Sequence, residues 1–428
     1  MPDISPFRGV RYSKKFAHQM ASIICPPYDV ISPEEQKAYY KKHQYNVIHV
    51  EHPMESPDDT ETDNKYTRAA GTFSEWLKNG ILEIDTIPTY YIHEHSFEYG
   101  EDTKVRMGLI ACVHLEPWEK NIIIPHEYTI AKVKADRLQL MRACAANSSP
   151  IFGLYEDPGQ RIAKLMQGKL LDSKLLFEIK RGSETHRVWK ANEPEFVQRV
   201  NHFMVTKSIY IADGHHRYET ALDYRDERRQ RDAYTGDETY NYVMMTLISF
   251  SDPGLLIMPI HRLLKNLPDK VIHELPTKLQ KYFEVTSLPL TGNKLPYTQD
   301  ASIMALGLEP GRVLTLKLRP GVSLHGIMPE DRPESYKKLE VSVVQHVILE
   351  HLMGITGETD MIAYTPNTEH AMKLVEAGDF QLSFLLNPIP SMTIKAIADA
   401  KDRMPRKSTF FHPKLPTGLV MNRLDGTL

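Results

Sequence analysis

Residues 208–222 read Ser-Ile-Tyr-Ile-Ala-Asp-Gly-His-His-Arg-Tyr-Glu-Thr-Ala-Leu. A short apolar strand ends in an Asp-Gly turn, and an amphipathic helix is predicted over 216–231. A strand that enters a helix through glycine exposes backbone N–H groups and the positive end of a helix dipole, where anions bind. Four side chains of this turn add acid–base groups and a charge clamp: Asp213, His215, His216 and Arg217.

The same turn also has a purely structural interpretation. Asp213 can cap the helix, Gly214 can serve only the turn, and the histidines can form a solvated loop. Two adjacent imidazoles and a guanidinium at one strand-to-helix junction favour the functional interpretation, with Gly214, His216 and Arg217 binding phosphate.

Composition narrows the class of protein. The 428 residues are 41% hydrophobic and 25% charged, which is typical of a globular chain with more than one domain. A net charge of −3 gives no basic surplus for nucleic acid or an anionic membrane. The three cysteines lie far apart, no run approaches the roughly 20 apolar residues of a membrane span, and the N-terminus has no apolar leader. We expect a cytoplasmic protein that acts on a small molecule, and the oligomeric state stays open.

The pattern of apolar residues predicts a mixed α/β or α+β fold with mixed sheets and flanking helices. Hairpin-like pairs come early and helix–strand alternation comes late. We predict three regions, over 1–150, 151–265 and 266–428. Helices are expected at 65–79, 194–205 and 341–353, and strands at 88–97, 105–115 and 312–318, among others.

Common nucleotide motifs are absent. The sequence contains no G-x-x-x-x-G-K-[ST], G-x-G-x-x-G, H-E-x-x-H or G-x-S-x-G. A bound nucleotide must therefore lie outside the usual phosphate loops.

Two further segments carry possible acid–base groups. Asp29, in Pro-Pro-Tyr-Asp-Val-Ile, is either a general base or a turn-stabilising carboxylate. His126 and Glu127 precede Arg137, and together they offer acid–base work and phosphate neutralisation, or else a polar loop before a helix. The following stretch at 148–155 is interpreted as a turn and a buried strand.

Two later segments carry cations. His261 and Arg262 follow an apolar strand, where such a pair is structural unless it reaches the cleft of the central turn. The segment 404–414 contains consecutive cations and hydroxyl groups that suit phosphate oxygens: Arg406, Lys407, Ser408 and Thr409. If there is one active site, Lys407 and Arg217 lie on the walls of one pocket.

Taken together, these segments resemble a widespread prokaryotic family known mainly as a conserved domain of unknown function. The resemblance rests on seven segments spread over nearly the whole chain: 26–31, 125–129, 136–155, 185–189, 213–221, 259–263 and 404–414. This resemblance identifies the relatives of the chain better than it identifies a reaction.

A shorter resemblance concerns chemistry. Asp213-Gly214-His215-His216-Arg217 is similar to the nucleotide-phosphate motif of the ParB/sulfiredoxin superfamily, which includes free-serine kinases. The resemblance implies a ParB/sulfiredoxin-like core in which Gly214 cradles phosphate and His216 and Arg217 bind it. Position 215 is histidine where sulfiredoxin has its catalytic cysteine, so sulfinic-acid reduction is not expected. A catalytic glutamate is expected in the kinases, and Asp29 and Glu127 are the candidates for that role.

The sequence thus predicts a phosphotransferase that uses ATP or ADP on a small hydroxylated metabolite, with free L-serine the first acceptor to test. Mg²⁺ would bridge the phosphates, with Asp213 a candidate ligand. Two alternatives stay open. One is a nucleotide-binding regulatory switch of the ParB kind, and the other is a metal-dependent hydrolase that uses His215, His216 and Asp213.

Overall fold

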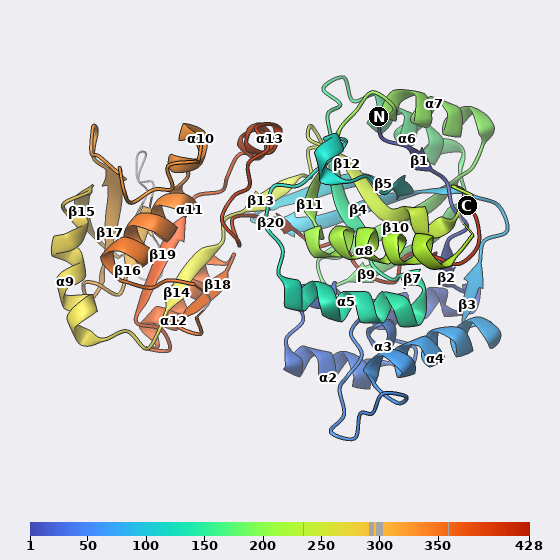
Figure 1. Ribbon diagram of the computed structural model, residues 1–428, viewed down its shortest axis with the longest axis horizontal. Coiled ribbons are helices and arrows are strands. Elements are labelled where there is room, and N and C mark those ends of the chain that lie inside the picture. Colours follow the sequence, from blue (N-terminus) through green and yellow to red (C-terminus); the bar gives the residue numbers. More distant parts are fainter. Residues whose placement is uncertain (234, 291–294, 297–302, 358) are drawn as a thin grey trace. The chain divides into compact units, whose positions relative to one another are not determined.

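The computed structural model describes residues 1–233, 235–290, 295–296, 303–357 and 359–428, which form two compact units (Figure 1). The first unit comprises Met1–Pro125, Thr129–Leu256 and Pro413–Leu428, and the second comprises His126–Tyr128 and Ile257–His412. The boundary predicted at residue 150 falls within the first unit, and the one at 265 falls within the second. The division into three regions stays a prediction.

A nine-stranded mixed sheet forms the centre of the first unit. Its order is β6-β11-β8-β12-β5-β4-β10-β9, with β1 added beside β5. β11 runs parallel to β6 and β12 runs parallel to β8, while the other pairs are antiparallel. The bounds are β1 Ile4–Ser5, β4 Tyr90–Tyr99, β5 Asp102–His114, β6 Ile123–Ile124, β8 Ile151–Tyr155, β9 Leu175–Arg181, β10 Glu184–Ala191, β11 Ile209–Asp213 and β12 Tyr242–Ser249.

Both faces of this sheet are buried because apolar residues occupy both sets of alternating positions. In β5, Leu109, Ala111 and Val113 belong to one apolar core, whereas Ile110 and Cys112 belong to another. Successive side chains of a strand point to opposite faces, so the two cores lie on the two sides of the sheet.

Helices flank the sheet, which confirms the predicted fold class. α5 lies alongside α8, and α4 lies alongside α5 (Figure 1). The helices of this unit are α1 Met20–Ile23, α2 Pro33–Lys42, α3 Ile48–Glu51, α4 Lys65–Lys78, α5 Ala131–Cys144, α6 Arg161–Asp172, α7 Pro194–Met204 and α8 His215–Arg231. Two small ladders complete the unit, β2 Val10–Tyr12 with β3 Leu82–Ile84, and β7 Ala146–Asn147 with β21 Asn422–Arg423.

The second unit contains an antiparallel six-stranded sheet of order β15-β17-β16-β19-β14-β18. Its strands are β14 His261–Leu264, β15 Phe283–Pro289, β16 Ile303–Leu306, β17 Arg312–Leu318, β18 Ile362–Thr365 and β19 Leu382–Leu386. α12 packs against β14, β18 and β19. The helices are α9 Asp269–Leu279, α10 Glu334–Lys337, α11 Glu340–Ser342, a π-helix at Val343–Leu352, α12 Thr368–Glu376 and α13 Ser391–Asp399, and a short ladder joins β13 Leu256–Met258 to β20 Phe410–His412.

Candidate functional site

The central motif forms the strand–turn–helix that its sequence predicts. β11 ends at Asp213, Gly214 adopts a φ of +96°, and α8 begins at His215. That φ lies in the left-handed region, which costs a residue with a side chain free energy that glycine avoids. A Cβ at position 214 would also lie 3.0 Å from Nε of Arg217, so glycine leaves room for this guanidinium. No side chain caps α8.

Asp213 holds two cations at this turn. Its Oδ2 accepts a hydrogen bond from Nη2 of Arg217 at 2.7 Å, and its Oδ1 accepts one from Nζ of Lys414. The three side chains are only 11–16% exposed. Burial alone would raise the pKa of Asp213, but the charges of Lys414 and Arg217 outweigh it and hold that pKa below its ordinary value. The result is a buried ion cluster with both cations in place.

Lys414 reaches Asp213 because the C-terminal segment returns to the first unit. Thr417 donates its N–H to the carbonyl of Cys25 at 2.8 Å, and β21 pairs with β7. The segment therefore runs beside the chain that leads into Asp29. The charge of Asp213 and, less strongly, that of Asp29 raise the pKa of both Lys414 and Arg217 against the opposing effect of burial. Lys414 lies in segment 404–414, but the phosphate-binding residues predicted there are 406–409, so Lys414 was missed. A signal was present, since Lys414 is a single cation before the uncharged stretch 415–422.

A second polar group lies on the same side of the unit. Glu51, only 2% exposed, accepts hydrogen bonds from the hydroxyls of Ser148 and Ser149. Arg137 donates to the backbone carbonyl of Glu51 at 2.7 Å, and its guanidinium lies 4.2 Å from the ring centroid of Tyr28. Sequence reasoning missed Glu51, although a carboxylate that follows Val47, Ile48 and Val50 in an apolar stretch is itself a signal.

These groups border a small cavity of about 40 Å³. The side chains that line it include Tyr28, Glu51, Arg137, Ser149 and Arg217. A water needs roughly 10–15 Å³ measured in this way, whereas pockets for drug-sized ligands measure about 300–1,000 Å³. The cavity thus admits an ion or a small polar group, and a nucleotide must lie mostly outside it.

The two histidines of the turn differ in their surroundings. His215 is buried, with 6% exposure. His216 is partly exposed, and its Nε2 accepts the backbone N–H of Ile130 at 2.9 Å, just before α5. Because Nε2 is the acceptor, the neutral ring carries its proton on Nδ1.

Three other predicted segments meet in the second unit, those of His126–Glu127, His261–Arg262 and 406–409, whereas Asp29 and Arg137 belong to the first. His126 accepts the N–H of Met404 through its backbone carbonyl at 2.9 Å, and its ring nitrogen lies 3.2 Å from Oγ1 of Thr409. Lys407 donates its backbone N–H to the carboxylate of Glu127 at 2.8 Å, and its carbonyl accepts from Arg262 at 3.0 Å.

The remaining predicted residues of the second unit have the following surroundings. The Lys407 side chain is exposed. Ser408 is buried and bonds to the carbonyl of Pro405, while Arg406 is partly exposed. His261 accepts the N–H of Leu386 at Nδ1 and bonds to Thr368. Because Lys407 and Arg217 belong to different units, their shared pocket stays a prediction.

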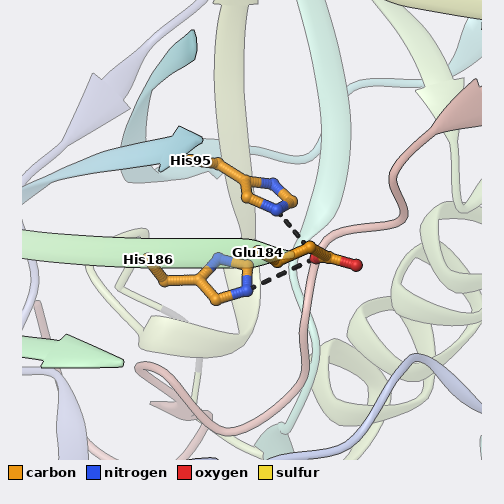
Figure 2. A group of neighbouring side chains, drawn as sticks. All are labelled: His95, Glu184 and His186. Carbon is orange, nitrogen blue, oxygen red and sulfur yellow. Dashed lines mark hydrogen bonds and ion pairs between the residues drawn. The ribbon is translucent and has the colours of Figure 1, made fainter. Parts of the chain in front are cut away.

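Among the described residues, one group has the geometry of metal ligands: His95, Glu184 and His186, on the adjacent strands β4 and β10 (Figure 2). Nε2 of His95 lies 2.8 Å from Oε2 of Glu184, and Nε2 of His186 lies 3.6 Å from it. The pattern His-x-His at 93–95 and Glu-x-His at 184–186 would have revealed this cluster in the sequence.

The position of the proton on the His95 ring disfavours a metal ion at this cluster. Arg106 donates to Nδ1 of His95 at 3.1 Å, so the neutral imidazole carries its proton on Nε2, the atom that faces Glu184. A metal ion on Nε2 would require that proton to move to Nδ1, against a guanidinium donor. The hydrogen-bonded arrangement in Figure 2 therefore fits a polar relay better than a metal site.

Residues 4–347 match the family described as "Protein of unknown function (DUF1015)". The chain belongs to this family. The match confirms the resemblance to a family of unknown function over residues 4–347, whereas segment 404–414 lies beyond it. The ParB/sulfiredoxin resemblance stays a prediction. No curated protein gave a significant match.

Solved structures give distant similarities. A mutant free serine kinase in complex with ADP is 11% identical, over 75% of this chain and 93% of that chain, with a TM-score of 0.38. A free serine kinase in complex with AMP is 10% identical, over 71% and 88%, with a TM-score of 0.37. A conserved hypothetical protein from Pyrococcus furiosus is 13% identical, over 73% and 94%, with a TM-score of 0.36. Scores this low do not carry an activity from those proteins to this one.

In the part of the chain that the structure describes, we find no helix with the length and apolar character to span a bilayer.

Proposed function

We propose that this protein is a nucleotide-dependent phosphotransferase for a small hydroxylated metabolite. The observation that carries the proposal is the buried cluster of Asp213, Arg217 and Lys414 at the glycine turn before α8. Phosphoryl transfer depends mainly on positioning and on neutralising charge, and this turn combines a helix N-terminus with two held cations.

In this proposal the turn binds the transferred phosphate. Gly214 lets backbone and phosphate approach closely, Arg217 offers a planar fork of donors, and Lys414 offers a point charge. Asp213 keeps both cations in place until a phosphate oxygen replaces one of its own contacts. A bound ATP or ADP supplies the phosphoryl group, and its base and ribose lie outside the 40 Å³ cavity.

Mg²⁺ is a further part of the proposal. Both oxygens of Asp213 already contact cationic side chains, so Asp213 becomes a ligand only when Arg217 or Lys414 has moved to phosphate. Mg²⁺ commonly takes one or two carboxylates together with substrate phosphates and water, which suits this arrangement.

Two carboxylates are candidates for the general base that activates the acceptor hydroxyl. Asp29 belongs to the first unit, and its charge acts on both Arg217 and Lys414. Glu127 belongs to the second unit and holds the backbone of Lys407. Replacement of the true base, by Asp29→Asn or Glu127→Gln, should abolish turnover while nucleotide binding persists.

A screen of ATP, ADP, CTP and GTP against hydroxylated amino acids, L-serine first, tests the proposal. Each reaction is run with Mg²⁺ and with EDTA. Arg217→Ala is the variant expected to be inactive, and Arg187→Gln, which replaces an arginine on β10, is the control variant. We expect phosphorylation of one acceptor by wild type and by Arg187→Gln only. Nucleotide binding without turnover of any acceptor would instead favour the regulatory switch.

The hydrolase alternative has less support. Among the described residues Asp213, His215 and His216 do not form a group with metal-ligand geometry. Release of phosphate in a reaction that needs a metal ion but no nucleotide would favour the hydrolase alternative.

Three free cysteines are in keeping with the proposed cytoplasmic location.

A further inference from the structure

Arg106, on β5, is a buried cation that the proposed reaction does not use. It is 1% exposed, and its guanidinium lies 5.0 Å from the ring centroid of Phe152 and 5.8 Å from that of Phe97. Burial lowers its pKa to about 10, so it remains charged at neutral pH. A charge in such a place is costly unless its hydrogen bonds and its charge are both balanced.

The hydrogen bonds of Arg106 connect two parts of the first unit. Its Nη2 donates to the backbone carbonyl of Pro413 at 2.8 Å and to Nδ1 of His95 at 3.1 Å. Pro413 is the residue before Lys414, which reaches Asp213. The backbone that carries the catalytic cation candidate is thus attached to the sheet by a side chain that lies outside the turn.

His95 connects Arg106 to the carboxylate of Glu184 through hydrogen bonds. Its Nδ1 accepts from Arg106 and its Nε2 donates to Glu184, so a neutral imidazole joins the guanidinium to a carboxylate. The charges of Asp252 and, less strongly, Glu184 oppose the effect of burial on the pKa of Arg106. His186 lies beside this chain, with its Nδ1 3.1 Å from Nε2 of His93, and burial lowers the pKa of both imidazoles.

We propose that Arg106 is a positioning residue, which holds the Pro413 carbonyl so that Lys414 stays on Asp213, and that Glu184, together with Asp252, balances its charge, Glu184 acting through His95. The positioning stands on these contacts alone, and only its use in phosphate binding rests on the proposed function. Lys414 has a second attachment at Thr417, three residues further on, so loss of Arg106 frees one side of the lysine without detaching the segment.

Chemical labelling of lysine amines tests this without any activity. Full-length protein is treated briefly with acetic anhydride, and the modified fraction of each lysine is measured by mass spectrometry. We expect Lys414, which is 12% exposed, to be modified about tenfold faster in Arg106→Gln than in wild type, because local opening of its segment no longer has to break the hydrogen bond from Arg106 to the Pro413 carbonyl. Lys190, ion-paired with Asp85, serves as the internal reference and should not change.

Two variants sharpen the result. Arg106→Lys keeps a cationic donor for the Pro413 carbonyl and should return the Lys414 rate toward that of wild type. Arg187→Gln removes an arginine that pairs with Glu94 and Glu178 and should leave Lys414 unchanged. If the Lys414 rate in folded Arg106→Gln equals that of wild type, the proposal is overturned.

Folding failure does not leave the question open. Should Arg106→Gln not fold, Glu184→Gln removes one of the two balancing charges, from a side chain that is 36% exposed, and it should raise the Lys414 rate severalfold. An unchanged rate there also overturns the proposal. Calorimetry with ADP separates the two ideas: faster labelling without ADP binding to wild type retains the positioning role and rejects the proposed function.

Discussion

Gly214→Ala tests whether the glycine of the central turn serves its neighbour Arg217 or only the backbone. The alanine would hold a φ of +96°, which costs about 1–2 kcal/mol. Its Cβ would lie 3.0–3.1 Å from Nε, Cζ and Nη2 of Arg217, so the guanidinium must shift. The shift weakens bonds to Asp213 at 2.7 Å and to the Pro150 carbonyl at 2.5 Å, for about 1.5–3 kcal/mol more.

Gly426→Ala is the matched control. Gly426 has a φ of +93°, and a Cβ there would meet no atom within 4 Å, so this alanine adds backbone strain alone. We expect urea unfolding at pH 7 to give a free energy of unfolding lower by about 2.5–5 kcal/mol for Gly214→Ala and by about 1–2 kcal/mol for Gly426→Ala. Equal losses would refute the argument that Gly214 makes room for Arg217.

Three further outcomes are expected. Arg217→Ala should weaken ADP binding by about 1.5–3 kcal/mol in titration calorimetry, and unchanged affinity would move the phosphate site elsewhere. Lys414→Met should cost about 3 kcal/mol in urea unfolding, because Asp213 loses one of two cations, whereas Lys407→Met, at an exposed position, should stay within about 0.5 kcal/mol and still lower turnover. Burial lowers the pKa of His261 to about 4. That histidine therefore contributes full stability above its unfolded pKa of about 6.5 and loses about 3 kcal/mol as the pH falls to 4, a loss that His261→Asn should not show in urea unfolding.

The sequence predicted local structure well because local patterns determine it. Apolar periodicity placed β17 at its observed bounds of 312–318 and α4 within one residue of its predicted range of 65–79. The strand, glycine and helix of the central turn also follow from local preferences. Helix 341–353 exists, but most of it is a π-helix, which a 3.6-residue apolar pattern does not distinguish from an α-helix.

The membership of the candidate site was predicted only in part, because it depends on contacts between distant residues. Asp213 and Lys414 are 201 positions apart, and nothing in the spacing of either motif indicates which cation reaches the carboxylate. Backbone pairing brings Lys414 to Asp213: Thr417 forms an isolated β-bridge with Cys25, and β21 pairs with β7. Glu51 was missed for the same reason, since its role depends on two serines almost a hundred positions away.

The charge balance of the turn has a consequence for binding. An arriving phosphate does not meet two unpaired cations, because Asp213 already neutralises part of the charge of Arg217 and Lys414. The phosphate must replace carboxylate contacts of similar strength, so its net gain is smaller than two new charged hydrogen bonds would suggest. A modest ground-state affinity suits the proposed phosphoryl transfer, since binding energy spent equally on substrate and transition state does not raise the rate of the chemical step. When one cation moves to the phosphate in this proposal, the other stays on the same carboxylate, so little further reorganisation is needed when negative charge develops on the transferred group.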